Sequence, residues 1–117
     1  MKLRLLTLMA GLTLALAGSA AAAYGPTTQR ATTVRVTAKD FSFALSTRSV
    51  PHGRITFVIR NAGHTVHDFA IGGRHSSKIG PGKTTRLTVT LNRGRYPYRC
   101  TVDSHATLGM KGVLRVT

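Results

Sequence analysis

A short stretch near the C-terminus carries the residues most able to do chemistry. Residues 96–110 contain the only cysteine of the chain, Cys100, followed by His105 and Met110. These side chains offer a thiolate, an imidazole and a thioether, a donor set that favours copper once a second imidazole joins it. Taken singly, each has a simpler explanation, because free cysteine and methionine commonly fill a hydrophobic core. The spacing Cys-x4-His-x4-Met makes a shared metal site the better hypothesis.

The second imidazole has two candidates in one upstream segment. His64 and His67 both lie within residues 61–71. We favour His67, because the residues after it predict a short strand over 67–71, whereas His64 directly follows Gly63 in a predicted turn. The sequence thus predicts four metal ligands: His67, Cys100, His105 and Met110.

The N-terminal segment has the composition of a secretory signal peptide. Lys2 and Arg4 precede an almost wholly apolar stretch over residues 5–17, and small residues continue to Ala23. An apolar stretch of this length is short for a membrane span. The signal peptide predicts a periplasmic or secreted protein. Because serine stands where a lipoprotein signal has cysteine, no lipid anchor is expected. The expected organisation is a signal peptide over residues 1–23, a flexible lead-in over 24–31 and one domain over 32–117.

The remaining chain shows the short alternating pattern of β-strands. Apolar and polar residues alternate in several segments that are separated by glycine, proline and asparagine. These and three further extended segments give the following expected strands: 33–38, 41–46, 55–59, 67–71, 87–91, 95–100 and 112–117. No segment after residue 23 has a convincing helical pattern. The sequence therefore predicts an all-β, Greek-key β-sandwich of about seven mostly antiparallel strands.

The charge of the chain is strongly positive. Seventeen lysine and arginine residues stand against three acidic ones, which gives a formal net charge of +14 at pH 7. The basic residues are scattered along the predicted strands, and the signal peptide argues for export, so nucleic-acid binding is not expected. The positive charge has two interpretations. It is either a general property of a basic surface without a specific role, or it attracts redox partners with acidic docking surfaces or an anionic membrane or envelope.

Two motifs in the chain carry a family resemblance. They are Asn-Ala-Gly-x3-His-Asp-Phe, which begins at Asn61, and Tyr-x-Cys-x4-His-x4-Met-x-Gly, which begins at Tyr98. Together they resemble the cupredoxin family, the plastocyanin and azurin type of blue copper protein, over about residues 32–117. The resemblance implies one type 1 copper ion, with an axial methionine and two histidines and a cysteine in a near-trigonal plane. The positions that match are His67, Cys100, His105 and, as the axial ligand, Met110.

The resemblance also implies details around the site. The spacing between cysteine and histidine is longer than in plastocyanin and closer to that of bacterial relatives. Asp68 stands where plastocyanins usually have asparagine, so it is expected to hydrogen-bond across to the cysteine loop and, by its charge, to lower the reduction potential. The outer edge of His105 is expected to reach the surface within an apolar patch formed by residues 106–109.

The function implied is an exported, monomeric protein that transfers single electrons between redox partners and is not an enzyme. Copper binding and delivery to an envelope oxidase is the alternative, because it uses the same ligands. A thiol enzyme with Cys100 as nucleophile is disfavoured, since it leaves Met110 without a role. Structural zinc is disfavoured as well, because zinc prefers Cys, His and carboxylate ligands.

Overall fold

The computed structural model describes residue 11 and residues 31–117. The predicted signal peptide, apart from Gly11, and nearly all of the predicted lead-in lie outside the described residues, so both stay predictions. None of the described residues belongs to a helix long and apolar enough to cross a membrane.

The described part of the chain is built from nine strands. In chain order they are β1 (Thr32–Lys39), β2 (Ser42–Leu45), β3 (Ser49–Val50), β4 (Gly53–Asn61), β5 (Ala70–Ile71), β6 (Arg74–His75), β7 (Thr84–Leu91), β8 (Gly94–Arg99) and β9 (Lys111–Val116). The excess over the expected seven comes from the two-residue strands β3 and β6, which are too short for a period-two pattern to show. The expected strand over 67–71 is also shorter, because only β5 pairs in a ladder.

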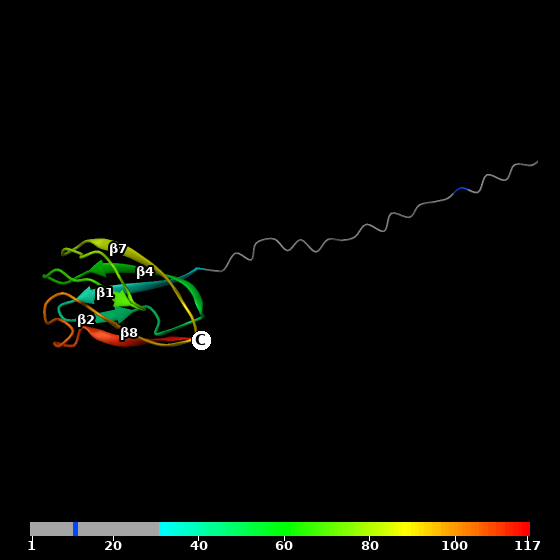
Figure 1. Cartoon of the computed structure of the whole chain (residues 1–117). Coiled ribbons are helices and arrows are strands. Elements are labelled where there is room, and N and C mark those ends of the chain that lie inside the picture. Colours follow the sequence, from blue (N-terminus) through cyan, green and yellow to red (C-terminus); the bar gives the residue numbers. More distant parts are fainter. Residues whose placement is uncertain (1–10, 12–30) are drawn as a thin grey trace, which may run out of the picture.

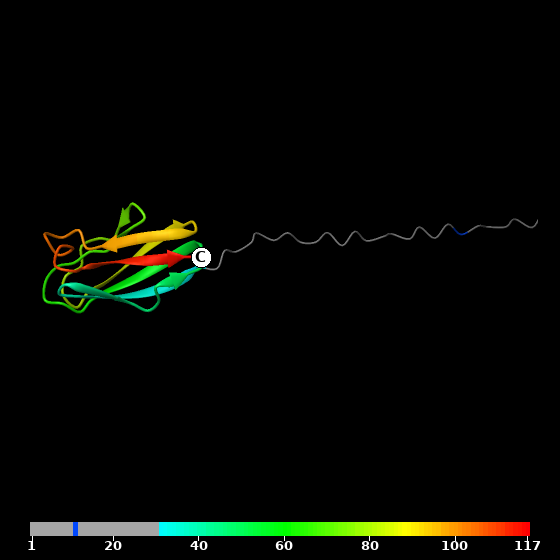
Figure 2. The same ribbon diagram turned by 90° about the horizontal axis from the view of Figure 1, so that it is seen from below.

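The strands form two sheets that pack face to face. The order is β2-β1-β4-β7 in one sheet and β3-β9-β8-β5-β6 in the other. Figure 2 shows orange β8 and red β9 in one layer and cyan β1 and green β4 in the other. The β1–β4 and β3–β9 pairings are parallel, and the other pairings are antiparallel. The predicted Greek-key sandwich of mostly antiparallel strands is thus confirmed.

Alternation along each strand buries one face between the sheets. In β4, Ile55, Phe57 and Ile59 are fully buried while the residues between them are not. The rings of Phe57 and Phe69 lie 5.0 Å apart, centre to centre, and Phe69 lies 5.4 Å from Tyr98. This aromatic row joins the two sheets, and each such buried side chain contributes about 1.5–3 kcal/mol through removal of apolar surface from water.

Three connections meet at the end of the sandwich that lies opposite the C-terminus (Figure 1). They are the turn between β1 and β2, the segment between β4 and β5, and the loop between β8 and β9. The parallel pairing of β1 with β4 sets Ala38 opposite Asn61, so the residues that follow β1 and those that follow β4 lie at the same end of the sandwich. We call this end of the sandwich the loop end, and it carries the candidate site.

Candidate metal centre

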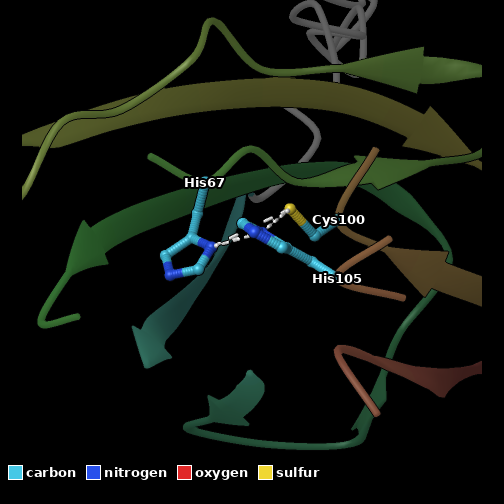
Figure 3. Close-up of side chains that lie close together, drawn as sticks. All are labelled: His67, Cys100 and His105. Carbon is cyan, nitrogen blue, oxygen red and sulfur yellow. Dashed lines mark hydrogen bonds between the residues drawn. The ribbon is translucent and has the colours of Figure 1, made fainter. Parts of the chain in front are cut away.

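The structure brings His67, Cys100 and His105 together at the loop end (Figure 3). The Nδ1 atoms of the two histidines are 3.2 Å apart, and Cys100 Sγ lies 4.0 Å from His67 Nδ1 and 3.7 Å from His105 Nδ1. A point equidistant from the three atoms lies about 2.1 Å from each, and nitrogen and sulfur ligands keep about 2.0–2.3 Å from a divalent first-row metal. The three donors therefore fit a single metal ion.

All three side chains are withdrawn from water. His67 is 0% exposed, Cys100 1% and His105 7%. Burial raises the pKa of the Cys100 thiol, because a charged thiolate is poorly solvated inside the sandwich. Only the thiolate binds metal, so a metal has to displace the thiol proton. The site is closed to solvent, and His105 is its most exposed member.

The segment before β5 positions His67 by backbone pairing. His67 N donates to Ile79 O over 3.1 Å, and Ile79 N donates to His67 O over 2.7 Å. Asn61, which is fully buried, donates from Nδ2 to the carbonyls of Thr65 and Ile79. His64 is exposed and is not part of the donor cluster. Of the two candidate histidines, the structure thus places His67 with the cysteine.

The loop between β8 and β9 fixes its residues through its own backbone. Cys100 N donates to Met110 O over 3.1 Å, and Met110 N donates to His105 O over 3.1 Å. Met110 itself is fully buried in the core at the end of this loop. That its thioether is an axial ligand stays a prediction.

Asp68 connects the two segments that supply the donors. It is 2% exposed, and its carboxylate accepts hydrogen bonds from the backbone N of Thr101, over 2.6 Å, and from the Thr101 hydroxyl. The expected hydrogen bond between the residue after His67 and the cysteine loop is thus confirmed, with Asp68 as the acceptor.

Two residues at the site were missed by the sequence analysis. Phe41 packs its ring 4.7 Å from that of His105, and Asp40 Oδ1 lies 2.7 Å from His67 Nε2. Both lie in the turn between β1 and β2. Phe41 was expected only as the first residue of the strand over 41–46, and no local pattern marks Asp40. The small number of acidic residues was a usable signal for Asp40, because the whole chain has only three of them, Asp40, Asp68 and Asp103.

A separate hollow of about 850 Å³ lies beside β5, β6, β8 and β9. Basic side chains at its edge include Arg74, Arg99 and Lys111, and none of the three clustered donors lines it. The three clustered donors, His67, Cys100 and His105, are therefore not part of this hollow.

Comparison with solved structures shows the same fold. An auracyanin from Roseiflexus castenholzii superposes with a TM-score of 0.65 at 22% identity, over 74% of this chain and 98% of that chain. Auracyanin B gives a TM-score of 0.66 at 22% identity, over 74% and 89%. Auracyanin A from Chloroflexus aurantiacus, described as a "blue" copper protein, gives 0.64 at 19% identity, over 75% and 100%.

Comparison at the level of sequence adds the family. No curated protein matches the chain significantly. The sequence model of the family described as "Cupredoxin-like domain" matches residues 6–116, which is nearly the whole chain. The chain therefore belongs to the cupredoxin-like domain family.

Proposed function

We propose that this protein is an exported, mononuclear type 1 copper protein that carries single electrons between redox partners. The observation that carries the proposal is the buried triangle of His67 Nδ1, Cys100 Sγ and His105 Nδ1, whose size suits one metal ion. Two imidazoles and one thiolate, with a weak axial thioether, are the donor set of blue copper sites. The structurally similar auracyanin A is described as a blue copper protein.

Four residues hold the metal in this proposal. His67 and His105 would supply two imidazoles, Cys100 a thiolate and the buried Met110 a thioether. Copper bound there supplies a one-electron couple, whose potential depends on the axial ligand and on the hydrogen bonds and polarity around the sulfur. The segment with His67 connects β4 of one sheet to β5 of the other, and the loop with Cys100 and His105 connects β8 and β9 of the second sheet, so both sheets position the donors.

The electron passes through His105 in this scheme. His105 is the donor nearest to solvent, and the exposed apolar side chains Val66 and Leu108 lie on segments at the same end, at 41% and 59% exposure. An apolar surface lets a partner dock closely without desolvating charge. The sequence predicts that residues 106–109 form this patch, and we propose that Val66 contributes to it.

We propose acidic redox proteins as partners, and no turnover of a substrate by this chain itself. The described acids are few and stand at the loop end, where Asp40 and Asp68 are already hydrogen-bonded, so the remaining surface is dominated by arginine and lysine. Such a surface speeds encounter with acidic proteins, and the gain falls with rising ionic strength. The composition of residues 1–23 supports export.

The experiment that tests the proposal is a visible spectrum after addition of Cu(II). We expect an intense band from thiolate-to-copper charge transfer that disappears in Cys100→Ser and His67→Ala. His64→Ala is the matched control, because this exposed histidine is only three residues away and should leave the band intact. A colourless protein, or a band that does not depend on Cys100, would contradict the proposal.

A further inference from the structure

The far side of the His67 ring faces a carboxylate. Asp40 Oδ1 lies 2.7 Å from His67 Nε2, while His67 Nδ1 faces Cys100 and His105. An ionised carboxylate can only accept hydrogen bonds, so His67 Nε2 carries the proton and donates it. The lone pair of this tautomer is then on Nδ1, the atom directed at the metal position.

Several other donors surround the same carboxylate. The backbone N of His64 donates to Asp40 Oδ2 over 2.8 Å, and the Thr65 hydroxyl and backbone N approach Oδ1 at 3.0 and 3.4 Å. These donors favour the charged form of the carboxylate, and an aspartate side chain is ordinarily an anion at neutral pH.

The loop over residues 61–67 is shaped around this anion. A Cβ on Gly63 would stand 2.9 Å from Asp40 Cγ and 2.9 Å from His67 Nε2, and closer still to Asp40 Oδ1. Only glycine fits that space without movement. The buried Asn61 fixes the loop from inside, since its Oδ1 accepts from Gly63 N over 2.9 Å and its Nδ2 donates to Thr65 O over 2.8 Å. We call residues 61–67 around Asp40 the carboxylate cradle.

We propose that Asp40 is a positioning residue of the copper site that orients His67 and favours Cu(II) over Cu(I). The inference rests on the proposed function. A carboxylate on the far nitrogen of a ligating histidine fixes its tautomer and makes the ligating nitrogen more basic. Its negative charge is not neutralised by a lysine or arginine salt bridge among the described residues, so it stabilises the more highly charged metal ion. Asp40 thus lowers the reduction potential.

The test compares two asparagine variants of the copper-loaded protein. Asp40→Asn keeps an oxygen that can accept from His67 Nε2 but removes the charge. We expect the blue band to persist and the ratio of Cu(II) to Cu(I) affinity to fall about tenfold, which raises the potential by about 59 mV for a one-electron couple. Asp103→Asn is the matched control, because Asp103 is an exposed acid of the cysteine loop with a φ of 44°, a conformation that asparagine tolerates.

The control separates a specific role from general charge. We expect Asp103→Asn to shift the potential by less than a third of the Asp40→Asn shift. Equal shifts, or no shift in Asp40→Asn, would overturn the proposal. Asp40→Ala, which removes both charge and acceptor, should in addition weaken Cu(II) binding about 10- to 100-fold.

A metal-free measurement distinguishes failure of this inference from failure of the proposed function. Imidazole ¹⁵N shifts of the metal-free protein report which nitrogen of His67 is protonated. We expect Nε2 protonation in the wild type and a mixture of tautomers in Asp40→Ala. A wild type that shows this tautomer but no blue band refutes the proposed function alone, whereas Nδ1 protonation in the wild type refutes the role of Asp40.

Discussion

Replacing Gly63 by alanine tests whether the carboxylate cradle is as tight as the structure shows. The new Cβ would lie 2.9 Å from both Asp40 Cγ and His67 Nε2, whereas ordinary van der Waals contact begins at 3.4 Å. The carboxylate, the imidazole or the loop therefore has to shift by roughly half an ångström or more. A shift of that size takes the 2.7 Å contact between Asp40 and His67 to about 3.2 Å, the outer limit for a hydrogen bond of this type.

The size of the effect follows from overpacking. An extra methyl group in a well-packed region costs about 1–3 kcal/mol. The imidazole is fully buried and cannot yield easily, but the Asp40 side chain is 21% exposed and can. Gly63 is not among the residues with positive φ, so the backbone adds no strain. We expect the free energy of unfolding of the metal-free protein to fall by about 1–2 kcal/mol, toward the lower part of the overpacking range.

Urea unfolding of the metal-free protein measures this change, with Gly80→Ala as the matched control. A Cβ on Gly80 would meet only Lys83 Cγ, at 3.9 Å, and its φ is also outside the left-handed region. The control should unfold at the wild-type urea concentration or slightly above, because alanine restricts the unfolded chain. Both variants make the same chemical change in a turn or loop.

A double variant shows where the cost arises. In Gly63→Ala combined with Asp40→Ala, the overlap with the carboxylate is gone and only that with His67 Nε2 remains, so the cost of the added methyl group should fall. The reasoning is refuted if Gly63→Ala has the same free energy of unfolding as Gly80→Ala. It is also refuted if Gly63→Ala lowers the free energy of unfolding by the same amount with and without the Asp40 carboxylate.

Three further predictions concern the core, the thiol and the charge beside it. Gly112→Ala should cost about 2–3 kcal/mol in urea unfolding, because its Cβ would lie 2.8 Å from Cε2 of the buried Tyr98 ring and nearer to the phenol oxygen; stability equal to that of Gly80→Ala would contradict this. Burial raises the pKa of the Cys100 thiol, so the thiol is protonated at neutral pH and Cu(II) affinity should rise about tenfold per pH unit below that pKa. Calorimetry in buffers of different ionisation enthalpy should show release of the thiol proton, and a pH-independent affinity would count against it. Asp68→Asn should raise the reduction potential, because an amide oxygen still accepts from Thr101 N while the charge is lost; voltammetry that finds no change would exclude an electrostatic role for Asp68.

The clustered donors could be predicted because residue type and spacing carry the information. Cys100 and His105 lie in one loop, and soft donors are so few in the chain that their proximity was informative. His67 could be preferred over His64 because a strand was predicted over 67–71, whereas His64 follows Gly63 in a predicted turn. The long strands were predictable for a related reason, since the alternation over 33–38, 55–59 and 87–91 leaves a clear pattern within β1, β4 and β7.

The missed residues depend on pairing between distant segments. Asp40 follows Lys39 at the end of β1, where the sequence indicates only a turn. It reaches His67 because β1 runs parallel to β4, with Ala38 opposite Asn61, so the turn after one strand meets the loop after the other. Register between strands that are not neighbours in sequence has no local signal. The two-residue strands β3 and β6 are missed for the same reason, because their pairing partners, not their own sequence, define them.

The protein carries positive charge over its surface and negative charge next to the candidate metal ligands. Basic side chains give the chain its formal charge of +14, but exposed charges are screened over about 8 Å at physiological ionic strength. Asp40 and Asp68 instead bond directly to His67 and to the residue after Cys100. Asp68 is buried, where screening by salt is weak, whereas Asp40 is an exposed residue whose effect depends on its direct contact with His67. We therefore propose that the surface charge acts on encounter with partners, which is a long-range effect, while the two carboxylates act on the oxidation state preferred at the ligands. A net charge read from composition bears on the first property, whereas the second depends on which charges contact the ligands.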